Sequence, residues 1–101
     1  MDFHNRLINL KQQSFFTNLV IERGIEKESL RVDKKGFISG QSHPKGLGSS
    51  FTNPSITTDF AEALIEIVTP VYTDINQLYK KLESLHVFIN KNLENGETLW
   101  P

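Results

Sequence analysis

Apolar side chains recur at helical spacing in two stretches of the chain. Between Thr73 and Leu93 they fall at steps of three and four residues, at Ile75, Leu78, Leu82, Leu85, Phe88 and Ile89. Thr73 or Asp74 can cap the start and Asn95-Gly96 the end, which predicts a helix over about 74–93. A second stripe, through Phe3, Leu7 and Leu10, predicts an amphipathic helix over about 3–16 that packs into the core.

Thr17–Val32 fits either a helix or a strand by pattern alone. Glu, Lys and Arg are good helix formers, but the stretch opens with β-branched residues and has Gly24 in its middle. Asp33–Gly36 then resembles a hairpin turn before Phe37–Ser39. We favour strands over about 17–32 and 37–39.

Ser55–Pro70 contains an apolar run with one acidic residue inside it. In a strand, Leu64, Glu66 and Val68 share one face, and Ile65 and Ile67 share the other. A buried glutamate needs a partner, so Glu66 is either ion-paired or part of a metal or catalytic site. The sequence predicts extended structure over about 55–69.

Asp59 and Glu66 can serve one site only if the chain bends between them. Fully extended, they would lie about 23 Å apart. We therefore expect a tight turn near Phe60–Ala63, although Asp59-x-x-Glu62 could instead be a helix capping box.

Length and composition limit the classes of function. The 101 residues, with a net charge of −1, suit a single small domain without the basic surface that nucleic acids or anionic membranes require. No apolar run approaches the roughly 20 residues of a membrane span, and no secretory signal is visible. Zero cysteines exclude disulfides, thiolate ligands and a cysteine nucleophile, and the combination favours the cytoplasm.

Two carboxylates at i and i+2, Glu26 and Glu28, are the first candidate site. On a strand they would project from one face about 7 Å apart, whereas on a helix they would diverge. Hard divalent cations such as Mg²⁺ take oxygen ligands. The pair alone is more typical of a solvated charged surface. The three histidines lack ligand spacing and are interpreted as surface residues.

Several ordered motifs make the pattern more specific. They are Arg23–Val32 (RGIEKESLRV), His43-Pro44, Leu47-Gly48, Ile56–Leu64 (ITTDFAEAL), Glu66, Thr69-Pro70 and Trp100-Pro101. With these motifs the chain resembles the N-terminal part of proteobacterial-type glutamate–cysteine ligase (γ-glutamylcysteine synthetase). Members of that family have several hundred residues, so residues 1–101 resemble only an N-terminal fragment of the catalytic domain.

The resemblance implies an α+β fold, part of a glutamine-synthetase-like curved antiparallel sheet with flanking helices. It implies an ATP-dependent ligase that joins glutamate to cysteine through γ-glutamyl phosphate, the first step of glutathione biosynthesis, without a protein nucleophile. By position, Glu26, Glu28, Asp59 and Glu66 resemble Mg²⁺ or Mn²⁺ ligands, and Phe60 resembles a residue of the cysteine pocket.

Two alternatives stay open beside the enzyme hypothesis. Since further ligands belong to later segments in this family, the chain alone is expected to be inactive. It could also be a non-catalytic binding module that self-associates through exposed strand edges. The acidic residues could, finally, do no more than solvate a surface.

Overall fold

A four-stranded antiparallel sheet organises the structure, a computed structural model that describes residues 2–59 and 61–101. The strands stand in the order β2-β3-β1-β4. In chain order the elements are α1 (Phe3–Gln12), β1 (Glu26–Val32), the 3-10 turn η1 (Lys45–Leu47), β2 (Ile56–Asp59), β3 (Ala61–Val68), α2 (Ile75–Asn92) and β4 (Thr98–Trp100). Helices beside an antiparallel sheet confirm the α+β prediction.

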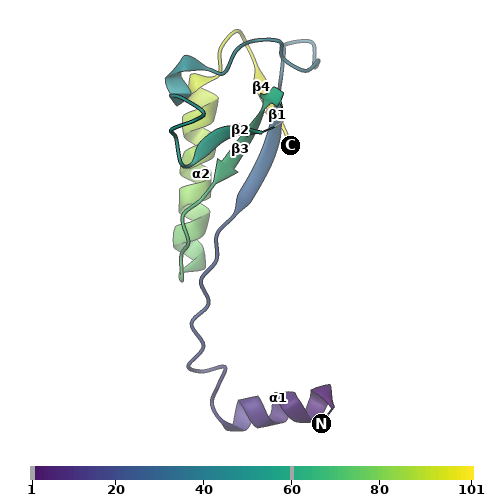
Figure 1. The fold of residues 1–101 in the computed structure, drawn as a ribbon, viewed down its shortest axis with the longest axis vertical. Helices are drawn as coiled ribbons and strands as arrows, with labels where there is room; N and C mark the ends of the chain where they lie inside the picture. Colours follow the sequence, from purple (N-terminus) through teal and green to yellow (C-terminus); the bar gives the residue numbers. More distant parts are fainter. Residues whose placement is uncertain (1, 60) are drawn as a thin grey trace.

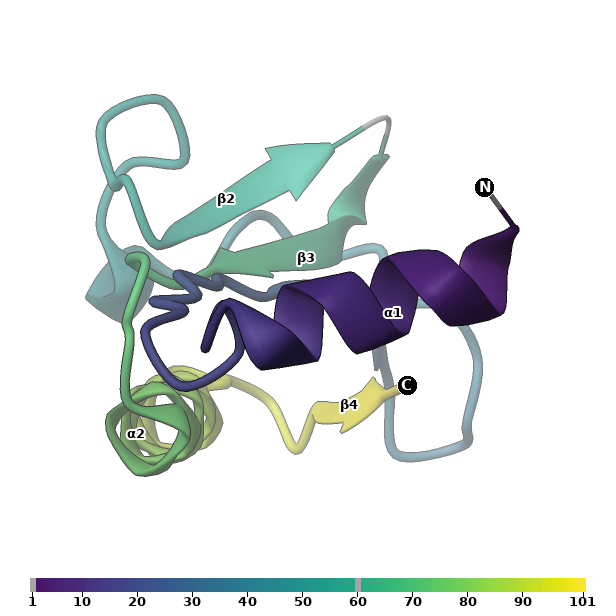
Figure 2. The same cartoon turned by 90° about the horizontal axis from the view of Figure 1, so that it is seen from below.

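The core lies between α2 and one face of the sheet. Figures 1 and 2 show α2 running along the sheet, with α2 seen end-on in Figure 2. Alternation along β3 sends Ile65 and Ile67 into this core, where both are fully buried with Leu85 and Ile89 of α2. The same alternation leaves Glu66 on the other face, as the sequence pattern predicted.

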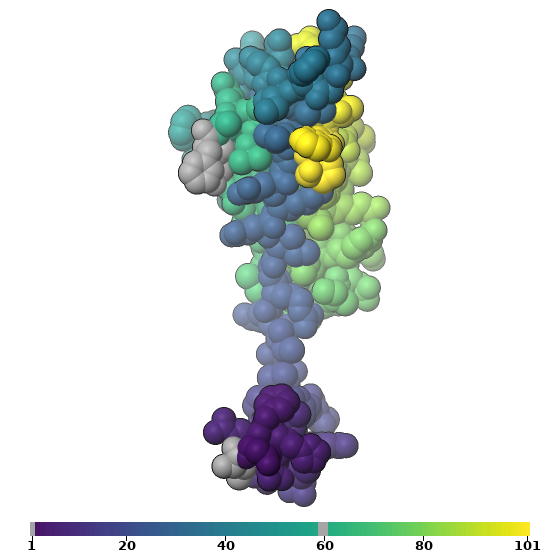
Figure 3. All heavy atoms as spheres, turned by 90° about the vertical axis from the view of Figure 1, so that its right-hand side faces the viewer, coloured from purple at the N-terminus to yellow at the C-terminus, as the bar shows by residue number. Residues whose placement is uncertain are grey.

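The N-terminal helix stands away from this core. Figures 1 and 3 show α1 at one end of the molecule, joined to the rest by a thin extended segment. The radius of gyration is 19.4 Å, well above the roughly 13 Å of a compact chain of this length. None of the α1 side chains is buried, so the expected packing of this helix into the core is not observed.

Helix α1 is also shorter than the predicted 3–16. Asp2 caps its start by accepting a hydrogen bond from the Asn5 amide at 2.8 Å. The helix ends at Gln12, and Ser14 adopts a left-handed backbone with φ 56°. Such a residue interrupts the helical dihedrals, which the apolar pattern alone could not reveal.

The predicted strand over 17–32 is wrong in its first part. Residues 17–22 form no strand: the chain leaves a turn at Thr17 and then runs without sheet pairing. Backbone pairing begins at Arg23, which exchanges hydrogen bonds of 3.0 Å with Tyr72, and Ile25 O accepts from the Thr69 amide at 2.9 Å. Neighbouring strands stabilise a strand, and the described residues place none beside this segment.

The predicted hairpin at Asp33–Gly36 is present, but its second strand is not. The Asp33 amide donates to Phe37 O at 2.8 Å, and the Gly36 amide donates to Asp33 O at 3.0 Å. Residues 37–39 then form only an isolated bridge between Ile38 and Val32.

Residues 55–69 form two strands rather than one. Asp59 at the end of β2 lies opposite Ala61 at the start of β3, with a register irregularity between Thr58 and Asp59. The chain therefore reverses direction where the sequence predicted a tight turn. No helix in the described residues has the length and apolar character needed to cross a membrane.

Candidate metal-binding face

The sheet face opposite α2 carries three of the four predicted ligands. Glu28 of β1 lies directly opposite Glu66 of β3 in the strand register, and Glu26 lies two residues before Glu28. Residues directly opposite on an antiparallel pair have Cβ atoms about 4.5–5.5 Å apart. Glu26 and Glu28 are exposed and Glu66 is half-buried, so this acidic face, defined by these three residues, is open to solvent.

Contacts on the covered side explain why the glutamates of β1 face outward. Lys27, between them, reaches α2, where its Nζ lies 3.0 Å from Nε2 of His86. His86 Nδ1 lies 3.0 Å from Leu82 O and would donate to it, which leaves Nε2 as the acceptor for the lysine. Because neighbouring residues alternate in a strand, anchoring Lys27 on α2 turns both glutamates to the open face.

The register of β1 and β3 is fixed at the Glu26 end of this face. The Ile25 amide donates to Thr69 Oγ1 at 2.8 Å, and the Thr69 amide donates to Ile25 O at 2.9 Å. A slip of one residue would move every side chain to the other face. These bonds therefore help to hold Glu28 opposite Glu66.

The carboxylate oxygens on this face are ligands of the kind that a hard divalent cation takes, but the side chains are not gathered around one point. Across the described residues, no three His, Cys, Asp or Glu side chains are close enough to hold a metal ion. Like charges directly opposite each other are unfavourable, and a cation between them would offset this repulsion.

The other two predicted site residues are Asp59 and Phe60. Asp59 ends β2, but its side chain, like all of Phe60, lies outside the described residues. The structure thus places the backbone of Asp59 on the strand beside β3. The roles expected for Asp59 and Phe60 stay predictions.

An apolar row borders the acidic residues on the same face. Leu30 of β1 pairs with Leu64 of β3 on one side and with Trp100 of β4 on the other, one step beyond the Glu28–Glu66 pair. Trp100 is 62% exposed. At the opposite end, beside Glu26, lies a shallow hollow of about 460 Å³. The face can therefore contact a cation and the less polar part of a ligand together.

A buried charged cluster, which the sequence did not predict, lies at the far end of β1. Arg31 is fully buried and its Nη1 forms an ion pair of 2.6 Å with Oε2 of Glu97. Its Nη2 donates to Gln41 O at 2.8 Å and to Glu62 O at 3.0 Å. One side chain thus ties β1 to the loop after it, to the start of β3 and to the turn before β4. The sequence could not identify this partner of Arg31, which is 66 residues away.

His43 belongs to the same cluster, and its interpretation as a surface residue is wrong. The residue is half-buried, and among the described residues neither ring nitrogen has a hydrogen-bond partner. Its backbone amide donates to Glu62 Oε1 at 2.9 Å. Burial lowers the pKa of His43 from its ordinary value of 6.5, the Arg31 charge lowers it further, and Glu62 acts in the opposite direction.

These features define a class: an α+β protein whose antiparallel sheet packs one face on a helix and carries acidic residues on the other face. Comparison with known proteins identifies the family, because the glutamate–cysteine ligase family profile matches residues 5–101. The chain therefore belongs to the glutamate–cysteine ligase family.

Individual relatives are considerably longer. The chain is 54% identical over 80 residues to a glutamate–cysteine ligase of Hahella chejuensis, a match that covers 79% of this chain and 15% of the relative. A glutamate–cysteine ligase of Shewanella pealeana is 46% identical over 81 residues, which are 80% of this chain and 15% of that protein. The chain thus spans about 15% of the length of these relatives.

Two solved structures share the fold. The crystal structure of glutamate–cysteine ligase from Francisella tularensis in complex with AMP has a TM-score of 0.75 and 40% identity, and the match covers 77% of this chain and 16% of that chain. A bifunctional glutathione synthetase from Pasteurella multocida has a TM-score of 0.83 and 31% identity, over 93% of this chain and 13% of that chain.

Proposed function

We propose that this chain is an N-terminal part of an ATP-dependent glutamate–cysteine ligase and that its open sheet face holds a divalent cation. The reaction joins the γ-carboxylate of glutamate to the amine of cysteine through γ-glutamyl phosphate. The observation that carries the proposal is the register, which sets Glu28 directly opposite Glu66 on the face that α2 leaves uncovered. Like charges at that position are explained by a cation that they share.

The proposed ligands are Glu26, Glu28 and Glu66, joined by Asp59 from the end of β2. A bound Mg²⁺ or Mn²⁺ would supply positive charge to the phosphates during phosphoryl transfer. The chain's own contribution is positional. The contact of Lys27 with His86 of α2 and the hydrogen bond between Ile25 and Thr69 keep the carboxylates in register on the open face.

The AMP bound in the Francisella tularensis relative supports the nucleotide part of the proposal. ATP would bring its phosphates to the acidic face only through a cation, because phosphates and carboxylates repel each other. We assign no nucleotide contact to this chain, and Phe60 is proposed to line the pocket for the cysteine side chain. Residues 1–101 alone are expected to be inactive, since further ligands and cationic groups would come from the rest of the ligase.

A chimera tests the proposal: residues 1–101 joined to the part of the Hahella chejuensis relative that follows its matched segment. The measurement is ADP formation that depends on both glutamate and cysteine. Glu28→Gln and Glu66→Gln should each lower kcat/KM by about 100-fold or more, since each removes a charge that stabilises the reacting phosphates through the cation.

Glu83→Gln is the matched control, because Glu83 is an exposed glutamate on α2 and lies on the opposite side of the sheet from the acidic face. It should leave activity unchanged. If Glu28→Gln and Glu66→Gln kept the activity of the control, the metal assignment would be wrong. An inactive chimera beside an active Hahella protein would contradict the ligase function of these residues.

The sheet edges favour a second candidate function. Strands β2 and β4 are the two edges of the four-stranded sheet, and unpaired edges can add strands from another molecule. A non-catalytic module that self-associates through them should show a concentration-dependent mass in sedimentation. A monomer across the concentration range would remove this candidate.

A further inference from the structure

The N-terminal segment, defined here as residues 3–21, carries large apolar side chains that no described part of the chain covers. Phe3 is 76% exposed, Phe16 is 50% exposed and Val20 is 74% exposed. The full exposed set is Phe3, Leu7, Ile8, Phe15, Phe16, Leu19, Val20 and Ile21. Single exposed apolar residues are ordinary, but so many within one short segment indicate an interaction surface.

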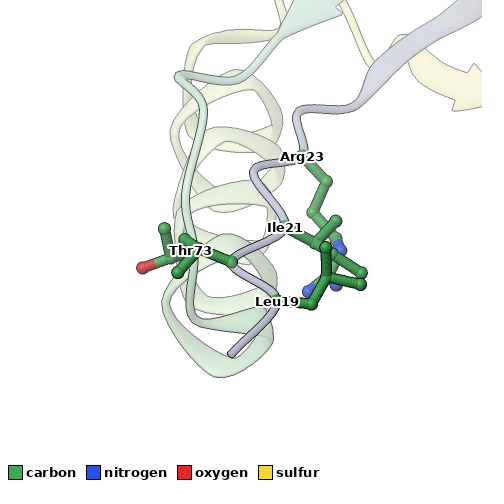
Figure 4. A pocket seen from close by; sticks show the side chains of 5 residues that line it. Leu19, Ile21, Arg23 and Thr73 are labelled. Carbon is green, nitrogen blue, oxygen red and sulfur yellow. The ribbon is translucent and has the colours of Figure 1, made fainter. Parts of the chain in front are cut away.

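Local structure presents these side chains together. Hydrogen bonds at the end of α1 include one from the Phe15 amide to Leu10 O at 3.0 Å, and the Phe15 and Phe16 rings meet edge-to-face at 5.4 Å. Farther along the extended part, Figure 4 shows Leu19 and Ile21 on one side of the backbone, next to Arg23. Together with Val20 and Thr73 they line a shallow hollow of about 390 Å³.

Part of the N-terminal segment belongs to the region that this chain shares with longer proteins. The family profile begins at residue 5, inside α1. The match to the Pasteurella multocida structure leaves out 7% of this chain, which is fewer residues than α1 contains, and it has a TM-score of 0.83. At least part of the N-terminal segment is therefore matched in a protein of which the matched region is only 13%.

We propose that the N-terminal segment is a docking surface for the remainder of the ligase fold, the approximately 85% of the relatives' length that this chain does not span. Burial of this apolar surface against that remainder would offset the cost of holding α1 away from its own domain. The surface suits a protein rather than an anionic membrane, because α1 carries only Arg6 and Lys11 as firmly basic residues. This inference rests on family membership and not on the metal site.

Hydrogen exchange tests the proposal by comparing α1 in the 101-residue chain with α1 in the Hahella chimera. In the chain alone α1 should exchange rapidly, because it has no buried residue. In the chimera its amides should exchange at least about 10-fold more slowly. Phe16→Ser should abolish that protection and lower the melting temperature of the chimera by about 2 °C or more.

Phe51→Ser is the matched control, since Phe51 is 97% exposed and lies outside the segment. It should change neither protection nor melting. The proposal fails if α1 exchanges equally fast in a folded chimera and in the chain alone. It also fails if the 101-residue chain forms a dimer that Phe16→Ser dissociates, because a second copy would then be the partner.

A second chimera covers the case in which the first does not fold. It takes residues 22–101 from this chain and the sequences before and after them from the Hahella protein. If this second chimera folds and the first does not, the segment does not fit the remainder of the ligase and the proposal is overturned.

Discussion

The two faces of the sheet hold charged groups in opposite settings. On the side of α2, Arg31 and Glu97 are buried and paired at 2.6 Å. On the open face, Glu28 and Glu66 are like charges set opposite each other, with Glu28 in solvent. The buried pair is enclosed by residues of this chain, whereas Glu26 and Glu28 are open to solvent on the face that α2 leaves uncovered.

This difference separates stability from function along the same strand. Lys27 and Arg31 of β1 contact other parts of this chain, and Glu26 and Glu28 alternate with them on the open face. Substitutions on the covered side should therefore change the free energy of unfolding, and substitutions on the open side should change metal binding. The following predictions test that separation.

The largest effect is expected at the buried ion pair. Glu97→Gln leaves the Arg31 charge buried without a counter-charge and should lower the free energy of unfolding by about 3–5 kcal/mol. Urea denaturation measures the loss. Glu94→Gln, an exposed change three residues earlier, should stay within about 0.5 kcal/mol. Similar losses in both variants would show that the pair does not carry the stability assigned to it.

Adjacent residues of β3 sharpen the comparison of the two faces. Ile67 is fully buried under α2, and Val68 is half-buried on the open face. Ile67→Ala should therefore cost about 2–5 kcal/mol of unfolding free energy, and Val68→Ala clearly less. Thermal or urea unfolding of the two variants measures this directly, and equal losses would contradict the assignment of faces.

Stability should also depend on pH through His43. Its pKa is lowered in the folded protein, so the unfolded chain takes up a proton first as the pH falls below about 6.5. The free energy of unfolding should decrease through that window and stop changing once the pH is below the folded pKa. His43→Gln should remove this slope, while the same change at exposed His4 should retain it. An unchanged slope in His43→Gln would rule out this histidine as its source.

The smallest change in the free energy of unfolding is expected for a substitution on the open face of the metal-free chain. Glu28→Gln relieves the repulsion from Glu66 and should stabilise the metal-free chain by about 0.2–1 kcal/mol. Urea unfolding in the presence of a chelator measures it. A loss of stability instead would mean that the Glu28 carboxylate already has a favourable partner in the fold.

The structural setting of a residue was predictable from sequence where a short-range pattern determines it. It was not predictable where it depends on a partner far away in the chain. Alternation placed Glu66 apart from Ile65 and Ile67, and spacing located the long helix. Arg31 could not be matched to Glu97 from sequence. Their contact depends on how the fold packs β1 against the loop at Gln41 and the turn before β4. The burial of His43 also depends on this packing, because His43 lies beside Arg31 and Glu62.

Two errors have the same physical origin. Residues 17–22 have strand-like composition, but a strand also needs neighbours to pair with. Residues 3–16 have a helical stripe, but the helix ends early and its apolar side lacks a covering surface in the described residues. Both segments have the pattern of packed structure, and the partners they require lie outside these 101 residues under the docking proposal.

Local line broadening by Mn²⁺ in the NMR spectrum of the 101-residue chain is the most direct test of the metal-binding face. Amides around Glu26, Glu28 and Glu66 should broaden first as Mn²⁺ is added, and Glu28→Gln should suppress that broadening while Glu83→Gln leaves it unchanged. Broadening spread evenly over the exposed carboxylates, or unaffected by Glu28→Gln, would contradict a metal site on the open face.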